Sequence, residues 1–364
     1  MPLVAHSKLP TFERMKHEGH DVLEEERASH QDIRELHIGL LNMMPDAALS
    51  ATERQFFRLV GSANLIAQFH MHVFTLDELP RSEQAREYID NYYETFDDIK
   101  RDGLDALIIT GANVTHPNLS SEPFWEPLAD VMAWAHENVT SVLCSCLATH
   151  ALLEHHYGIK RNPMEFKRWG IFDHKVSMPE HPLVENINTR FDVPHSRFNQ
   201  VTRQQLEEKG VVVLAEGEEA GVHLAVSPDL FRTVFFQGHP EYDSNSLLKE
   251  YKREVLLWFD DQRDGHPPFP DNYLTPQAKA ILGEYRSELI ASRETGIEPP
   301  EFPEKLLMTL IDNTWRDTAK AVVSNWLGHV YQITNSRREL PFMDGIDPQD
   351  PLGLKSMPSI NGSS

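Results

Sequence analysis

Short apolar runs that alternate with helix-compatible stretches are the feature that most constrains the fold of this chain. The apolar runs are typical of buried strands and lie at 37–41 (HIGLL), 68–76, 105–110 (DALIIT) and 139–146 (VTSVLCSC). Helical spacing of apolar residues lies between them or directly after them, at 51–61, 123–138 and 147–158. Buried strands connected by helices form a parallel sheet that is covered on both faces. The sequence therefore predicts an α/β fold with a mostly parallel central sheet flanked by helices.

The second half of the chain has a different pattern. Strand-like runs follow one another with little helix between them, at 170–176, 190–193, 210–215, 222–226 and 233–237. Three helices are expected after them, at 246–263, 276–293 and 303–330. We predict four segments: a solvated N-terminal arm at 1–35, a central α/β domain at 36–265, a helical C-terminal extension at 266–340 and a disordered tail at 341–364.

The charge of the chain limits its classes of partner. The 34 Lys and Arg against 56 Asp and Glu give a net charge of −22, which repels a phosphate backbone and argues against nucleic acid. No apolar run approaches the about 18–20 residues that a membrane span needs, and the N-terminus does not resemble a signal peptide. Cys144 and Cys146 are the only two cysteines of the chain, too few for a disulfide framework, and we expect no disulfide between them. These features predict a cytoplasmic protein without a membrane partner.

Cys146 is the strongest local candidate for a catalytic residue. In VLCSCLA (142–148) it stands between a buried strand and a helix, as the nucleophile does in a strand–turn–helix elbow. The N-terminus of a helix favours a thiolate and can hold a developing oxyanion. Cys144 and Ala148 occupy the places where a strict elbow has glycine. The alternative is that both cysteines are inert, buried strand residues.

His239 and Glu241 form the second signal. The apolar run 233–237 ends in Gly-His-Pro-Glu, 93 residues after Cys146. A thiol nucleophile needs a base, and the base needs an acceptor that fixes its tautomer. A His-x-Glu sequence directly after a strand supplies both groups from one loop.

The order of these motifs resembles class I glutamine-amidotransferase-like domains, and within them the homoserine O-acyltransferases of methionine biosynthesis. The resemblance runs from about Arg34 to Thr334, and it rests on LLNMMP (40–45), TGA (110–112), WAHENVTSVLCSCLATHALLEHHYGI (134–159), PHSR (194–197), FFQGHPEYD (235–243) and NWLGHVYQIT (325–334). It implies an amidotransferase-like catalytic domain at 36–265. It also implies a homodimer, with homoserine and an acyl-CoA as substrates and no tightly bound cofactor.

The resemblance also implies roles for individual residues. Cys146 would accept the acyl group, His239 would be the general base and Glu241 would orient it. Lys167, Ser196 and Arg253 match positions that contact the substrate. These residue types suit transfer from an acyl-CoA thioester to the hydroxyl of homoserine, and the guanidinium of Arg253 suits the homoserine carboxylate.

The residue at position 115, a threonine, indicates which acyl donor to expect. In the family that the chain resembles, a glutamate five residues after the Thr of TGA goes with acetyl and a glycine with succinyl, whereas this chain has Thr115. A glutamate would repel the distal carboxylate of a succinyl group, while an uncharged threonine can donate a hydrogen bond to it. We therefore expect succinyl-CoA, with acetyl-CoA as the alternative. The loop after Pro45 lacks the lysines usual in the family, which leaves the binding of CoA open.

Three other interpretations stay open on the sequence. A glutamine amidotransferase or peptidase would share the Cys, His and Glu, although the chain has no Gly-rich ATP-binding loop. A non-catalytic binding domain would keep the fold but have an unreactive Cys146. A metal site is not expected, because the histidine pairs lack a ligand spacing with a Cys or Glu set. Those pairs are His17/His20, His70/His72 and His155/His156.

Overall fold

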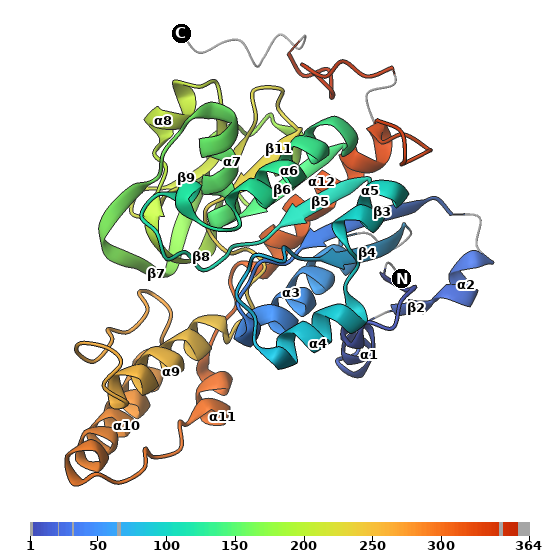
Figure 1. Cartoon of the computed structure of the whole chain (residues 1–364). Helices are drawn as coiled ribbons and strands as arrows, with labels where there is room; N and C mark the ends of the chain where they lie inside the picture. The colour runs from blue at the N-terminus through green and yellow to red at the C-terminus, as the bar shows by residue number, and fades with distance from the viewer. Residues whose placement is uncertain (1–2, 21, 31–32, 64–66, 342–344, 356–364) are drawn as a thin grey trace.

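The computed structural model describes residues 3–20, 22–30, 33–63, 67–341 and 345–355, and its centre is one mixed sheet. Within these residues the strand order is β2-β1-β4-β3-β5-β6-β11-β10-β9-β7-β8 (Figure 1). The strands are β1 (Leu3–Ala5), β2 (Val22–Glu24), β3 (Glu35–Leu41), β4 (Gln68–Phe74), β5 (Ala106–Ile109), β6 (Ser141–Ser145), β7 (Asn162–Val176), β8 (Arg190–Gln200), β9 (Val212–Gly217), β10 (Gly221–Val226) and β11 (Thr233–Phe236).

The sheet divides into a parallel and an antiparallel part. From β2 to β11 in the spatial order, each strand runs parallel to its neighbour. The remaining strands, β10, β9, β7 and β8, pair antiparallel. This confirms the predicted α/β fold with a mostly parallel central sheet. The carboxyl ends of β3, β5, β6 and β11 therefore meet at one edge, where an α/β sheet places its ligands.

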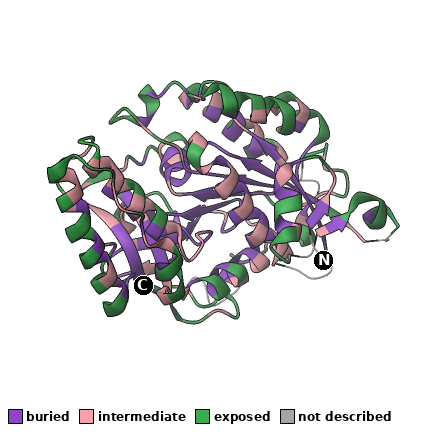
Figure 2. Cartoon of the chain, turned by 90° about the horizontal axis from the view of Figure 1, so that it is seen from below, coloured by how far each residue is buried: buried purple, intermediate pink, exposed green. Residues whose placement is uncertain are grey.

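Helices cover both faces of the sheet (Figures 1 and 2). One core packs α1 (Pro10–His17), α3 (Leu49–Gly61) and α12 (Arg316–Ile333) against one face. The other core packs α5 (Phe96–Asp102), α6 (Trp125–Asn138) and α7 (Leu147–Tyr157) against the opposite face. The other helices are α2 (Glu25–Ser29), α4 (Glu83–Tyr92), α8 (Arg203–Glu207), α9 (Ser246–Phe259), α10 (Pro276–Thr295) and α11 (Glu304–Leu307). The 3-10 turns are η1 (Asp46–Ala48), η2 (Leu119–Ser121), η3 (Pro182–Val184) and η4 (Met308–Leu310).

A third core lies in a lobe beside the sheet. It packs α9 and α10 against Trp169 and Ile171 of β7, and the lobe projects at the lower left of Figure 1. The helix that we expected at 303–330 is instead broken into α11, η4 and α12. Because α12 packs on the sheet, residues 266–340 do not form a single helical extension. The indole N–H of Trp326 donates to Ser141 Oγ at 2.8 Å and fixes α12 to β6.

The ends of the chain also differ from the expectation. Instead of a solvated arm, residues 3–30 contribute β1 and β2 to the sheet edge, and Leu3 and Phe12 are buried in the first core. Of the predicted disordered tail, 342–344 and 356–364 lie outside the described residues. Residues 345–355 form turns, and Leu354 is buried. Single apolar side chains that reach the cores, such as Leu3, Phe12 and Leu354, anchor these charge-rich segments.

Among the described residues, no helix is both long and apolar enough to cross a bilayer.

Candidate active site

Cys146 occupies the turn between β6 and α7. Its backbone has φ 54° and ψ −109°, a conformation that L residues rarely adopt. The amide of Cys146 donates to Phe236 O at 2.8 Å, which ties the turn to the end of β11. Cys144, in contrast, is fully buried on β6, and burial raises the pKa of its thiol well above the usual value. The buried-strand interpretation therefore applies to Cys144, whereas Cys146 is partly exposed at a sharp strand-to-helix turn.

His239 and Glu241 follow β11, which lies directly beside β6. The register pairs Phe236 with Ser145, so the two strands end side by side. His239 Nδ1 lies 2.8 Å from Glu241 Oε1, and both side chains are buried. The fold thus brings together residues that are 93 positions apart in the sequence.

The electrostatics of His239 link it to both neighbours. Burial alone would lower the pKa of His239, but the charges of Cys146 and Glu241 and hydrogen bonds to both raise it well above the usual value. The imidazole can therefore hold a proton between a thiolate and a carboxylate. This is the arrangement of a nucleophile, a base and an orienting acid.

Ser145 is a residue of the site that sequence reasoning missed. Its hydroxyl lies 3.2 Å from Glu241 Oε1 and donates to the same oxygen that accepts from His239. The side chain comes from the last residue of β6 and is buried. Its place directly before Cys146 was the signal available in the sequence.

Two loops from neighbouring strands close around Cys146. A Cβ built on Gly111, which follows β5, would lie 3.7 Å from Cys146 Cβ and 3.7 Å from Met44 Sδ, after β3. The same position lies 3.8 Å from the backbone nitrogen of Leu147. The N–H groups in the first turn of a helix lack acceptors within the helix. The amide of Leu147 is therefore a donor that can face an oxyanion formed beside Cys146.

The loop after Pro45 receives its positive charge from Arg81. The side chain of Arg81 is almost fully buried; it donates to Met44 O at 2.5 Å and forms an ion pair with Asp46 at 3.3 Å. Asp46 also accepts from the amide of Ser82 at 2.8 Å. In this chain an arginine distant in sequence thus supports the loop that lacks lysines, and its contacts are with the loop itself.

Lys167 and Ser196 meet at a residue that the sequence analysis did not single out, Glu250 of α9. Ser196 Oγ donates to Glu250 Oε2 at 2.6 Å, and Lys167 Nζ lies 3.3 Å from the same oxygen. The hydroxyl of Tyr242 donates to Glu250 Oε1 at 2.7 Å, and the Tyr242 ring stacks on His239 with centroids 4.2 Å apart. A continuous set of contacts therefore joins His239 to Lys167 and Ser196.

Glu250 remains charged in this position. Burial raises its pKa, but the Lys167 ammonium and hydrogen bonds from Ser196 and Tyr242 outweigh burial, and the net pKa is lowered. Tyr242 lies inside the FFQGHPEYD motif that carried the resemblance, and Glu250 lies three residues before Arg253. Their roles were missed because neither residue type alone indicates a site.

Arg253 and Thr115 lie apart from this group. The Arg253 side chain is 61% exposed and pairs with Glu254 at 3.2 Å, rather than joining Lys167 and Ser196. The Thr115 hydroxyl donates to Glu122 Oε2 at 3.3 Å, and the amides of Thr115 and His116 both donate to Glu122 Oε1 at 2.6 Å. Burial would raise the pKa of Glu122, but these hydrogen bonds lower it.

Among the described residues, the groups of side chains that could hold a metal ion lie elsewhere. They are His6, His72 and Glu94, and Glu35, His37 and His70. None of the site residues described above belongs to them.

The sequence of this chain is similar to those of known proteins. Residues 2–336 match the family model of homoserine O-succinyltransferase. The homoserine O-succinyltransferase of Thiothrix nivea is 64% identical over 99% of this chain and 100% of its own length. That of Methylococcus capsulatus is 62% identical over 97% and 100%. Among solved structures, a glutamine amidotransferase from Thermotoga maritima is 10% identical, with a TM-score of 0.41, over 81% of this chain and 97% of its own.

The match to the family model extends over nearly the whole chain, and the relatives align with it almost end to end. The chain is therefore an acyltransferase of amino-acid biosynthesis, and it belongs to the homoserine O-succinyltransferase family.

Proposed function

We propose that this enzyme transfers a succinyl group from succinyl-CoA to the hydroxyl of L-homoserine through a thioester on Cys146, giving O-succinylhomoserine and CoA. The observation that carries the proposal is the position of His239, whose pKa is raised by Cys146 and Glu241 together. An imidazolium between a thiolate and a carboxylate is ready both to release and to take up one proton.

The first half of the reaction acylates the enzyme. The Cys146 thiolate attacks the thioester carbonyl, and the amide of Leu147 faces the resulting oxyanion. The bond to the CoA sulfur breaks, and His239 gives its proton to the departing thiolate of CoA. His239 is then neutral, and the acyl group is bound to Cys146.

The second half transfers the acyl group to homoserine. The homoserine hydroxyl attacks the acyl carbonyl while His239 takes its proton, and Cys146 leaves as a thiolate. The thiolate–imidazolium pair is then restored. Glu241 holds the imidazole through Nδ1 and stabilises its charged form, and Ser145 holds Glu241.

Lys167, Ser196 and Arg253 are proposed to bind the substrates. Lys167 and Ser196 are fixed by Glu250, and Tyr242 connects them to His239. Arg253 has an exposed guanidinium that suits the homoserine carboxylate.

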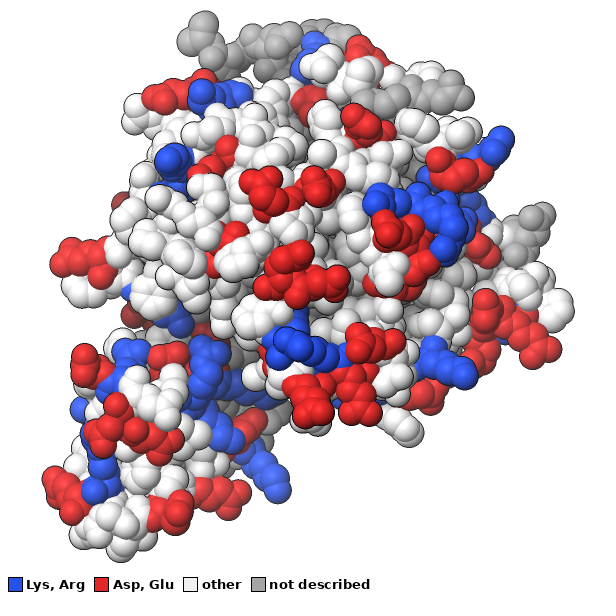
Figure 3. Space-filling view, viewed as in Figure 1, with Lys and Arg blue, Asp and Glu red and all other residues white. Residues whose placement is uncertain are grey.

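Binding of CoA requires local positive charge on a chain of net charge −22. On the face shown in Figure 3, basic side chains gather where the lobe meets the rest of the molecule. A cavity of about 450 Å³ between β7 and the lobe is lined by the basic side chains of Lys167 and Arg263, together with the acidic side chains of Glu165, Glu254 and Asp271. We propose that this region attracts the phosphates of CoA.

Thr115 is proposed to admit the succinyl group. Its hydroxyl and amide already bind the carboxylate of Glu122, so a glutamate at this position would add a second negative charge beside it. Such a charge would also repel the distal carboxylate of a succinyl group.

The experiment compares kcat/KM for succinyl-CoA and acetyl-CoA with L-homoserine in the wild type, Thr115→Glu and Thr115→Gln. We expect the wild type to prefer succinyl-CoA. Thr115→Glu should weaken succinyl transfer by at least about 5-fold more than acetyl transfer, since one like charge costs on the order of 1 kcal/mol or more. Thr115→Gln is the neutral control of similar size. A preference of the wild type for acetyl-CoA would overturn the donor, and equal effects of Glu and Gln would overturn the role of Thr115.

A further inference from the structure

Four histidines gather at the parallel edge of the sheet, away from the acyl-transfer site. We call His6, His37, His70 and His72, with Glu35 and Glu94, the edge histidine cluster. Neighbouring rings in it have centroids 4.6–5.1 Å apart. Nothing in the proposed acyl transfer uses these residues, so their proximity needs its own explanation.

The sheet register produces the cluster. β3 and β4 pair His37 with His70, and His72 lies two residues further along the same face of β4. β1 pairs Leu3 with Phe69 in parallel, and the same register continued just past the end of β1 brings His6 level with His72. The expectation of no metal site rested on the spacing of histidines along the chain. The structure brings the histidines together through strand pairing, which that spacing does not reveal.

His6 presents an unpaired nitrogen to the cluster. Its Nδ1 lies 3.1 Å from Val4 O, and because a carbonyl can only accept, Nδ1 carries the hydrogen. In the neutral ring Nε2 then holds a lone pair. This atom is buried and has no hydrogen-bond partner among the described residues. A histidine that donates one nitrogen to a backbone carbonyl and points the other at a site has the geometry of a metal ligand.

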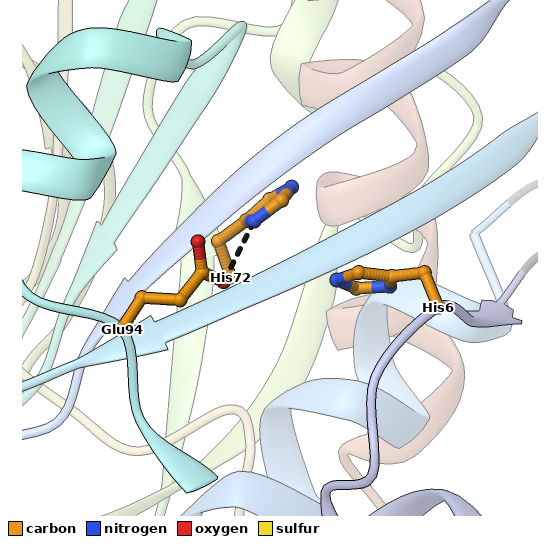
Figure 4. A group of neighbouring side chains, drawn as sticks. All are labelled: His6, His72 and Glu94. Atoms are coloured by element: carbon orange, nitrogen blue, oxygen red, sulfur yellow. Dashed lines mark hydrogen bonds and ion pairs between the residues drawn. The ribbon is translucent and has the colours of Figure 1, made fainter.

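Glu94 completes a ligand set with His6 and His72. Its amide donates to Val73 O at 2.8 Å, which fixes the segment between α4 and α5 against β4. Glu94 Oε1 lies 2.8 Å from His72 Nδ1. Figure 4 shows the His6 ring directed toward this pair. One ligand atom from each of the three residues lies within 4.8 Å of the others.

The hydrogen bonds around His72 leave room for one more positive charge. His72 Nε2 lies 2.8 Å from His37 Nδ1, and His37 Nε2 lies 3.4 Å from Glu35 Oε2. The contacts form a chain, Glu94–His72, His72–His37 and His37–Glu35, and each of the three needs one N–H group. Two neutral imidazoles supply only two N–H groups. A cation between Glu94 and His72 Nδ1 removes this deficit, because His72 Nε2–H can then donate to His37, and His37 Nε2–H to Glu35.

We propose that His6, His72 and Glu94 bind a divalent transition-metal ion, with Zn²⁺ as the ion that this ligand set suits. Two imidazoles and one carboxylate are a common set of protein ligands for Zn²⁺, with water as the fourth ligand. Ligands at about 2.0–2.2 Å in a tetrahedral site are about 3.3 Å apart. His6 therefore has to move inward by up to about 1.5 Å, and Glu94 has to separate slightly from His72.

The bound ion would clamp the N-terminal segment to the sheet. His6 follows the short strand β1, His72 lies within β4 and Glu94 precedes α5. His37 and Glu35 act as positioning residues through His72. Because a metal that binds the folded chain selectively stabilises it, the ion should raise the melting temperature.

The test uses the full-length protein after dialysis against a chelator. Zn²⁺ is titrated by calorimetry, and Co²⁺ is used as a spectroscopic probe whose visible absorption reports the number and type of ligands. We expect one equivalent to bind. His6→Gln and Glu94→Gln should each weaken binding by more than about 100-fold, and His37→Gln by about 10- to 100-fold, the usual effect of losing a partner of a ligating histidine.

His17→Ala is the matched control, because His17 is an exposed histidine of the same N-terminal segment outside the cluster. It should bind as the wild type does. Circular dichroism and transferase activity verify that each variant is folded. If the wild type does not bind Zn²⁺ or Co²⁺, or if His6→Gln and Glu94→Gln bind as tightly as His17→Ala, the proposal is wrong.

Discussion

Three groups surround the His239 imidazole. Glu241 accepts at Nδ1, Cys146 interacts with the ring through its charge and a hydrogen bond, and Tyr242 stacks on the face of the ring. Burial would favour the neutral ring, so the two anionic neighbours decide the outcome. Each substitution here tests one contribution.

Glu241→Gln should separate the orienting role of Glu241 from its charge. The amide can still occupy the position near Nδ1, but the charge that helps to raise the pKa of His239 is lost. We expect kcat to fall by about 10²- to 10⁴-fold, the range of a general acid–base contribution. The pKa of His239, followed by NMR of labelled histidine, should shift downward. An unchanged pKa would contradict this assignment.

At the residue scale, the sequence predicted the residues that carry the chemistry better than the residues that hold them in place. Cys146, His239 and Glu241 could be proposed because their types and their positions after strands carry a mechanism. Tyr242 and Glu250 could not, since a tyrosine and a helical glutamate have many ordinary roles. Arg253 was expected with Lys167 and Ser196, but Glu250, one turn earlier on α9, is the residue that contacts both.

At the scale of elements, the adjacent strands β6 and β11 determine where the site lies. Their parallel register ends both strands at one edge, and Gly238 then lets the chain turn toward His239. A Cβ on Gly238 would lie 2.6 Å from Val193 Cγ1 and 2.9 Å from His195 Nε2, both in buried side chains of β8. Neither neighbour can move aside easily.

Gly238→Ala should therefore displace the loop that carries His239. A shift of about 1 Å in a catalytic group can cost about 10²-fold, and we expect a loss of kcat of this size. Gly283→Ala on the exposed face of α10 is the control, because nothing lies within 4 Å of its added Cβ. It should keep full activity and gain about 0.5–1 kcal/mol of stability. Wild-type kcat in Gly238→Ala would show that this close packing does not position His239.

Helices and strands with a clear period of apolar residues could be predicted from the sequence. Those that depend on packing against distant parts of the chain could not. The strands β3, β5 and β6 and the helices α3 and α7 follow from local apolar patterns. The division of 303–330 into α11 and α12 depends on where each helix packs. The sheet strands β1 and β2 are three residues each, too short for a period to be recognised.

At the scale of the whole molecule, many histidine side chains are buried in their neutral form. Burial lowers the pKa of His150 to about 3, and of His174 and His181 to about 4. In the unfolded chain such groups titrate near 6.5. Because the unfolded state then binds more protons, the folded state loses stability as the pH falls below about 6.5. His239, whose pKa is raised, acts in the opposite direction.

Each buried neutral histidine should cost about 2 kcal/mol of unfolding free energy between pH 6.5 and pH 5. Urea unfolding at pH 7 and pH 5 measures the total. His181→Gln should reduce this pH dependence by about that amount, whereas His155→Gln, at an exposed position, should leave it unchanged. Equal pH dependence in the wild type and His181→Gln would contradict the assignment.

The oligomeric state of the whole molecule stays a prediction. The resemblance implied a homodimer. The indoles of Trp315 and Trp326, in the C-terminal helical region, are buried within the single chain, where they donate to Tyr242 O and Ser141 Oγ. Light scattering after size exclusion would determine whether other surfaces form a dimer.

The central claim is that Cys146 carries the acyl group. Mass spectrometry of the intact protein after brief exposure to succinyl-CoA, without homoserine, tests it most directly. The account predicts a gain of one succinyl group, mapped to Cys146, absent in Cys146→Ala and removed when homoserine is added. No gain in mass, or acylation of Cys144 instead, would contradict it.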